Sequence, residues 1–154
     1  MKKIIIALCL MVGVSFAGQI TQTTPELQVI LDNAYESVVT VKQASDFGTI
    51  DSTKVYVIDG VIDMGSTSIE IPSGGITVMG FSFDVSQLVS TEASYDMFTS
   101  PVGGSGNLLV IDVGLEASGA GSQVFNIVSD TGLGATEFTR VYWNNCTSLG
   151  VIDN

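Results

Sequence analysis

The side chains that could perform chemistry in this chain are few, because several common catalytic types are missing. The 154 residues contain no histidine and a single arginine, Arg140. Ser-His-Asp triads, Cys-His pairs and histidine-based zinc sites therefore cannot form within the chain. Carboxylates and a few aromatic rings remain, and they form no catalytic constellation. The sequence predicts no enzyme activity, no cofactor and no metal site for this chain.

Two pairs of carboxylates have spacings that could still form a binding site. Asp59 and Asp63 are four residues apart, so an extended strand would direct both side chains to one face, where a hard cation or a sugar could bind. Asp84 and Glu116 fall at equivalent positions of two similar segments and could flank one surface groove. For Asp59 and Asp63 a solvated outer face is the favoured interpretation. Like charges stacked across strands repel each other, so Asp84 and Glu116 indicate either a weak cation site or an incorrect register.

Two adjacent aromatic residues, Tyr142 and Trp143, form a further candidate site. An exposed ring on an acidic surface can stack against a neutral sugar. We therefore predict that Tyr142, Trp143, Asp84 and Glu116 contact a glycan. Because side chains alternate along a strand, one of the two rings must point inward. The alternative is one core ring and one incidental surface ring.

The elements that position these residues follow an N-terminal segment with the pattern of a signal peptide. Lys2 and Lys3 precede an apolar run over residues 4–14, and small residues lie at Ser15 and Ala17. We predict that residues 1–17 engage the membrane and export machinery and are cleaved after Ala17, which makes the product secreted or attached to the cell surface. A permanent membrane anchor is the alternative. Cleavage also removes one of the two cysteines, so no internal disulfide is expected.

Residues 18–39 contain one amphipathic pattern. Thr23 and Glu26 have the spacing of a capping box, and Pro25 suits a first helical turn. A helical apolar stripe follows at Leu27, Ile30, Leu31, Ala34 and Val38. The pattern predicts a helix that covers the first open coil of the domain formed by residues 40–154.

Residues 40–154 contain a repeated β pattern. The segments "ITVMGFSFDVSQL", "LLVIDVGLEASGA" and "TRVYWNNCTSLGV" align with Met79 over Ile111 over Tyr142. A period near 30 residues indicates stacked units that bury their apolar faces on one another. We predict an all-β, right-handed parallel β-helix with coils starting at Lys54, Ile76, Leu108 and Phe138. Gly-rich corners are expected at residues 73–75 and 102–106, and a β-sandwich or jelly roll is the alternative.

The "VIDGVIDMG" run, the "ITVMGFSFDVSQL" coil and the "NNCTSLG" ending, together with the predicted capping helix, resemble right-handed β-helix proteins of the pectin-lyase-like class. The resemblance covers residues 40–154 and is strongest to the N-terminal coils of phage tail spike and receptor-binding proteins. It implies a non-enzymatic structural or adhesion module that binds a cell-surface glycan or host receptor. It also implies a homo-oligomer such as a trimer, in a virion or on a secreted adhesin.

Enzymes of the same class provide the alternative function. Their lyases use an arginine base beside calcium-bound carboxylates, and their hydrolases use grouped aspartates near a histidine; neither set is present here. The chain would then be the N-terminal fragment of a secreted polysaccharide lyase or glycoside hydrolase whose catalytic coils lie beyond Asn154. An apolar ending at Val151 and Ile152 predicts that further sequence or another subunit covers the last coil.

The charge balance excludes one class of partner. Five basic residues face 16 acidic ones, and the net charge is −11. Nucleic-acid binding depends largely on Lys and Arg that neutralise phosphates. Nucleic acid is therefore not an expected partner.

Overall fold

The computed structural model describes residues 37–128 and 134–153. The predicted signal peptide, with its cleavage position after Ala17, and most of the predicted capping helix lie outside these residues. The described part of the chain is almost entirely β structure, with one short 3-10 helix, η1 (Ala44–Phe47). Within it, no helix is long and apolar enough to cross a membrane.

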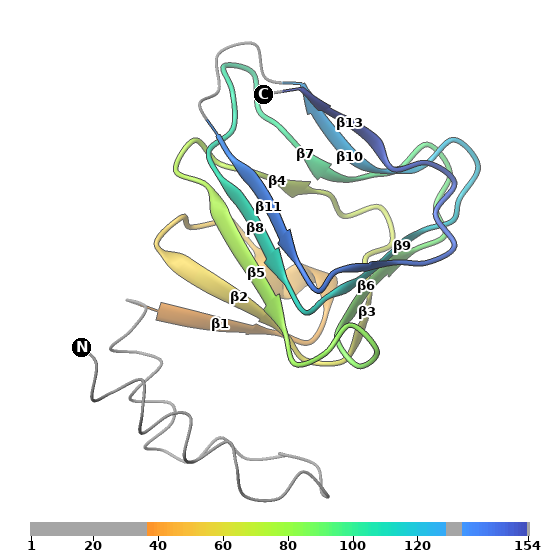
Figure 1. Cartoon of the computed structure of the whole chain (residues 1–154), viewed down its shortest axis with the longest axis horizontal. Helices are drawn as coiled ribbons and strands as arrows, with labels where there is room; N and C mark the ends of the chain where they lie inside the picture. The colour runs from red at the N-terminus through yellow and green to blue at the C-terminus, as the bar shows by residue number, and fades with distance from the viewer. Residues whose placement is uncertain (1–36, 129–133, 154) are drawn as a thin grey trace, which may run out of the picture. The chain divides into compact units, whose positions relative to one another are not determined.

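The described strands form three sheets in which every pairing is parallel (Figure 1). Sheet A contains β1 (Ser37–Val41), β2 (Lys54–Ile58), β5 (Ile76–Gly80), β8 (Leu108–Ile111) and β11 (Thr136–Thr139). Sheet B contains β3 (Val61–Asp63), β6 (Gln87–Ser90), β9 (Gly114–Ala117) and β12 (Tyr142–Trp143). Sheet C contains β4 (Ile69–Glu70), β7 (Asp96–Thr99), β10 (Gln123–Val128) and β13 (Gly150–Asp153).

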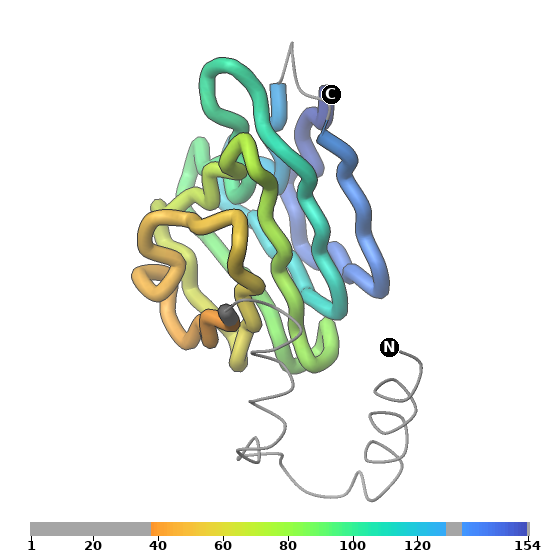
Figure 2. Tube along the Cα trace, turned by 90° about the vertical axis from the view of Figure 1, so that its left-hand side faces the viewer, coloured from red at the N-terminus to blue at the C-terminus, as the bar shows by residue number. Residues whose placement is uncertain are grey.

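From β2 onward the chain visits sheets A, B and C in turn, and each round pairs with the round before it. Figure 2 shows these coils stacked in sequence, from the orange segment that contains β1 to the blue segment that ends with β13. The architecture is a solenoid of parallel strands, and it is consistent with the predicted parallel β-helix. The alternative of a β-sandwich requires antiparallel sheets, which the described residues do not contain.

The predicted coil starts at Lys54, Ile76 and Leu108 are confirmed, since β2, β5 and β8 begin at these residues. The register of the last coil was predicted wrongly. Met79 pairs with Ile111 as expected, but Ile111 pairs with Thr139 and not with Tyr142, and β11 begins at Thr136 and not at Phe138.

Unequal coil lengths explain the error in register. Residues 81–86 connect β5 to β6, whereas only residues 112–113 connect β8 to β9. The coil that starts at Leu108 is therefore four residues shorter than the coil that starts at Ile76. An alignment that assumes equal coil lengths therefore places the start of the next coil too far along the sequence by about this number of residues.

The first strand also corrects the predicted boundary at residue 39. Val38, the last member of the predicted helical stripe, lies in β1 and pairs with Val55 of β2. The β1 sequence, SVVTV, is dominated by β-branched residues, which favour an extended backbone. At residues 37–39 the helix prediction is therefore wrong.

Apolar side chains fill the interior of the solenoid, as predicted. One inward row of sheet A runs through Tyr56, Val78, Val110 and Phe138. Sheet C contributes Phe98 and Phe125, whose rings stack with centroids 5.7 Å apart. Each fully buried large side chain of this kind contributes about 1.5 to 3 kcal/mol to folding.

Glycines form the corners where sheet C leads back to sheet A, as the sequence predicts. Gly75 has a φ of 87°, and Gly103 and Gly104 have φ values of 102° and 99°. Residues with a side chain rarely adopt this backbone region. These corners therefore allow each coil to begin again beside the previous one.

Candidate functional site

The outer face of sheet B contains a depression built around a missing side chain. One outward row in this sheet runs through Val61, Gln87, Gly114 and Tyr142. Because Gly114 has no side chain, the row is interrupted between Gln87 and Tyr142. The result is a depression of about 160 Å³ lined by Asp84, Gln87, Gly114, Leu115, Glu116, Tyr142 and Asn144.

The loop of residues 81–86 forms one wall of this depression. Ser86, the last residue of this loop, is fully buried. Its Oγ accepts a hydrogen bond from the Phe81 backbone N–H (2.9 Å) and donates one to the Ile58 carbonyl (2.8 Å). The loop also contacts Gly114 closely, because a Cβ added there would lie 2.6 Å from the Phe83 carbonyl oxygen. Glycine is therefore needed at residue 114 for the loop to lie where it does.

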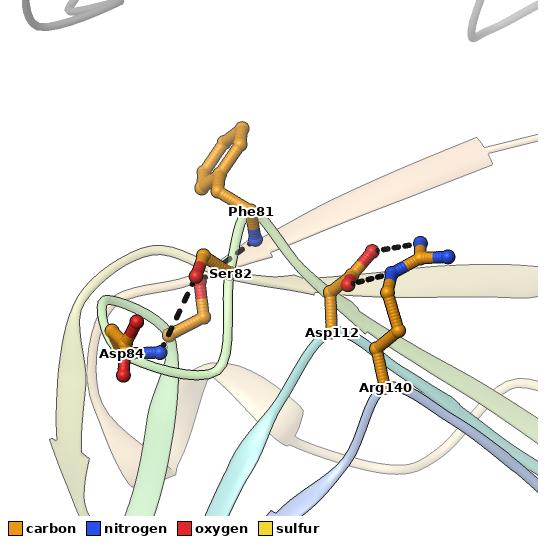
Figure 3. Close-up of polar contacts among 6 residues, drawn as sticks. Phe81, Ser82, Asp84, Asp112 and Arg140 are labelled. Carbon is orange, nitrogen blue, oxygen red and sulfur yellow. Dashed lines mark hydrogen bonds and ion pairs between the residues drawn. The ribbon is translucent and has the colours of Figure 1, made fainter.

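The loop places two of its side chains on different sides. In Figure 3 the Phe81 ring points away from Asp84, whose backbone N–H donates to Ser82 Oγ at 3.4 Å. Asp84 lines the depression, whereas Phe81 is 61% exposed and is not among the lining residues. The Asp84 carbonyl also accepts a hydrogen bond from Gln87 Nε2 at 3.2 Å, which connects the loop to β6.

Tyr142 presents the aromatic surface of the depression. Its side chain is 53% exposed, and the ring lies 5.5 Å from that of Phe83 at an interplanar angle of 35°. Trp143 points to the interior, where its ring meets the rings of Phe125 at 5.5 Å and Phe138 at 5.1 Å edge-on. The two predicted glycan-contact rings are thus separated by strand alternation, and only Tyr142 belongs to the depression.

The depression brings together Asp84 and Glu116, but for a different reason than predicted. Glu116 pairs in register with Val89, so the prediction that Asp84 and Glu116 occupy equivalent strand positions is wrong. Asp84 lies in the loop of residues 81–86, which reaches the depression by folding over Gly114. The insertion that misaligned the coils also brings this carboxylate toward β9.

Both carboxylates in the depression lack a cationic partner among the described residues. The three described cations form ion pairs elsewhere: Lys42 with Asp59, Lys54 with Asp51, and Arg140 with Asp112. Glu116 accepts a hydrogen bond from Asn145 Nδ2 at 2.8 Å, and its remaining lone pairs can accept further donors. A ligand that donates several hydroxyl hydrogen bonds matches this set of acceptors.

The corner next to the depression is held by a cross-coil ion pair. Arg140 Nε and Nη2 each donate to one carboxylate oxygen of Asp112, in the bidentate arrangement of Figure 3. Both residues have positive φ, 51° for Arg140 and 57° for Asp112. Hydrogen bonding to Asp112 raises the pKa of Arg140 above its usual value. This pair connects the last coil to the coil before it.

Asp59 and Asp63 do not form the shared site that their spacing suggests. Asp59 lies in the corner between β2 and β3, 3.5 Å from Lys42 Nζ. Asp63 lies within β3 and accepts a hydrogen bond from the Gly65 backbone N–H at 2.9 Å. The prediction of one strand that directs both carboxylates to one face is wrong. Within the described ranges, no group of three or more His, Cys, Asp or Glu residues could hold a metal ion.

Gly114, Phe83 and Gln87 are parts of the site that sequence reasoning missed. An available signal was the glycine inside the apolar run "LLVIDVGLEA", since a glycine within a strand often marks the close approach of another backbone. Comparisons of the chain with protein-family models, curated proteins and solved structures find no match. The functional argument therefore rests on the geometry of the depression.

Proposed function

We propose that this chain is a non-enzymatic, right-handed β-helical module of the pectin-lyase-like class. It is of the structural or adhesive type found in phage tail spikes and secreted adhesins. It binds a cell-surface glycan through the depression on sheet B. The observation that carries the proposal is the grouping of Tyr142, Asp84 and Glu116 around Gly114. An aromatic face beside carboxylate acceptors suits the two chemically different sides of a sugar ring.

The contacts available in the depression set the expected strength of binding. The C–H face of a sugar can pack on the exposed Tyr142 ring, while its hydroxyl groups donate to Asp84, Glu116 and the Asn144 side chain. Hydrogen bonds to charged acceptors contribute about 1.5 to 3 kcal/mol each. A volume of about 160 Å³ is smaller than a typical ligand pocket of roughly 300 to 1,000 Å³. The depression therefore encloses only a small part of an oligosaccharide, and single-site binding is expected to be weak.

The predicted signal peptide favours the secreted or surface-attached form of this module. A secreted adhesin uses a cleavable leader directly, whereas in a virion protein the same N-terminal run would remain as an uncleaved hydrophobic segment. Weak single sites are also typical of adhesion, because several copies displayed together raise the apparent affinity through effective concentration.

A glycan array followed by calorimetry tests the proposal. The purified chain is applied to the array, and the strongest oligosaccharide is titrated into the wild type, Tyr142→Ala and Phe81→Ala. Phe81 is a matched control because it is an exposed aromatic residue next to the depression but outside its lining. We expect Tyr142→Ala to weaken binding about fivefold or more, because an aromatic ring packed on a ligand contributes about 1 kcal/mol or more, and Phe81→Ala to bind like the wild type.

Three results would contradict the proposal. The first is an array with no bound oligosaccharide. The second is equal affinity of Tyr142→Ala and wild type for the bound oligosaccharide. The third is a shortened or unsaturated product after incubation, which would show that the chain cleaves the glycan and is an enzyme.

A further inference from the structure

Sheet A has an apolar outer face. Outward positions alternate with the inward row through Tyr56 and Val110, and two outward rows cross the sheet in register. Six apolar side chains in these rows define what we call the apolar face: Val38, Val55, Val57, Met79, Leu109 and Ile111. None of the six belongs to the hydrophobic core cluster. Val55 is buried, and the other five are half-buried.

The apolar face is almost free of charge, although the chain is strongly acidic. The remaining outward positions in its two rows are Thr40, Thr77, Thr139 and Glu137. Glu137, on β11, is thus the single carboxylate in these rows, whereas the net charge of the chain is −11. Two copies of such a chain repel each other through most of their surfaces. A face with a single carboxylate is where they can approach at the smallest electrostatic cost.

The dimensions of the face set the strength of such an association. Five strands about 4.8 Å apart, each four or five residues long at roughly 3.3 Å per residue, give a face of about 19 by 15 Å. Two sheets that pack face to face lie about 10 Å apart. The total buried surface stays below about 1,200 Å², at the low end for specific interfaces. The area predicts a weak association that depends on concentration.

We propose that a second copy of this chain docks on the apolar face, so that sheet A of one copy packs against sheet A of the other in a homodimer. Apolar side chains would be removed from water on both sides. Sheet B lies outside this contact, so each copy keeps its depression accessible. The inference stands on sheet A alone and does not depend on glycan binding.

Sedimentation velocity of the full chain over a wide concentration range tests this proposal. The variants are Val57→Glu on the apolar face and Val61→Glu on the outer face of sheet B, where Val61 is 61% exposed. Both introduce the same charge by the same substitution, four residues apart. We expect the wild type and Val61→Glu to shift from the mass of one chain to that of two as concentration rises. In Val57→Glu the dissociation constant should rise by about 30-fold or more, because the dimer would bury an unpaired charge.

Further readouts keep the test decisive. Higher salt should strengthen association of the wild type by screening repulsion between the acidic copies. Circular dichroism checks the fold of each variant, and if Val57→Glu fails to fold, Ile111→Thr decides, since threonine keeps a β-branched side chain in the strand. That variant should weaken association several-fold. A wild type that stays at the mass of one chain throughout, or equal association of the folded apolar-face variant and Val61→Glu, would overturn the proposal.

Discussion

The outer faces of sheets A and B are formed by the same coils, yet the side chains that they direct outward differ sharply in polarity and charge. Sheet A directs six apolar side chains outward with a single carboxylate, Glu137, in the same rows. Sheet B directs Asp63, Gln87, Glu116 and Tyr142 outward and has a gap at Gly114. The comparison teaches that the inward rows determine the solenoid, while each outer face is free to acquire its own chemistry.

The largest effect on stability is expected for the inward row of sheet B, which lies next to an outward row on the same strands. Leu115, 1% exposed, points inward between Leu88 and Trp143, so Leu115→Ala should lower the free energy of unfolding by about 2 to 5 kcal/mol. Val89→Ala, in an outward row, should cost less than about 1 kcal/mol. Urea denaturation of both variants measures the difference. Equal losses would mean that the inward and outward rows are assigned wrongly.

The glycine gap provides the next test of the comparison. A Cβ at residue 114 would lie 2.6 Å from the Phe83 carbonyl oxygen and 3.0 Å from Gln87 Cγ. Gly114→Ala should therefore displace the loop of residues 81–86 and cost about 1 to 3 kcal/mol, and it should also abolish glycan binding. Thermal unfolding and calorimetry read the two effects. Gln87→Ala is the control for stability alone: it removes a side chain from the same row without a clash and loses one exposed hydrogen bond, so it should cost less than about 1 kcal/mol.

The sequence predicts the solenoid better than it predicts the register. Apolar runs such as "ITVMG" and "LLVI" separated by glycines indicate buried parallel strands, and the coil starts at Lys54, Ile76 and Leu108 follow from them. The length of each corner has no comparable signal. The extra residues in the loop of residues 81–86 shift the alignment, which is why Tyr142 was matched to Ile111 in place of Thr139.

The candidate site was predicted in part, and the outer face of sheet A was not predicted at all. Tyr142, Asp84 and Glu116 meet in the depression, but their meeting depends on an absent side chain at Gly114. The glycine within the run "LLVIDVGLEA" was a signal for this gap that the alignment of the coils did not use. Strands β2, β5 and β8 of sheet A contain nearly continuous apolar residues, and such runs indicate burial on both faces. A run of this kind does not say whether its second face is covered by the same chain or by another copy.

The cross-coil ion pair beside the depression should give a smaller effect that depends on salt. Arg140→Ala removes a bidentate contact to Asp112, so it should lower stability at low salt more than Lys42→Ala, which removes a single contact to Asp59 at 3.5 Å. The side chains of Arg140 and Lys42 are 64% and 69% exposed, so high salt should reduce both losses. Thermal unfolding at two salt concentrations measures this. A loss for Arg140→Ala that is unchanged by salt would show that the arginine acts through packing.

The smallest effect concerns two carboxylates that belong to neither outer face. The Lys42 backbone N–H lowers the pKa of Asp46, and the Thr53 hydroxyl lowers the pKa of Asp51. Because these folded-state pKa values lie below the unfolded values, the stabilisation is present above about pH 4 and is lost as pH falls through the folded values. In Asp51→Asn the free energy of unfolding, measured by urea denaturation at several pH values, should fall less steeply toward low pH than in the wild type. An equally steep decline in Asp51→Asn and in the wild type would contradict this prediction.

The measurement that tests the account most directly is a ¹H–¹⁵N NMR titration of the wild type with the oligosaccharide selected on the array. It reports on both outer faces at once. The account predicts that shifts concentrate in residues 81–90, 114–117 and 142–145 around the depression, while the sheet A strands β2, β5 and β8 stay unchanged. Shifts centred on those sheet A strands, or none at saturating oligosaccharide, would contradict the assignment of glycan binding to sheet B.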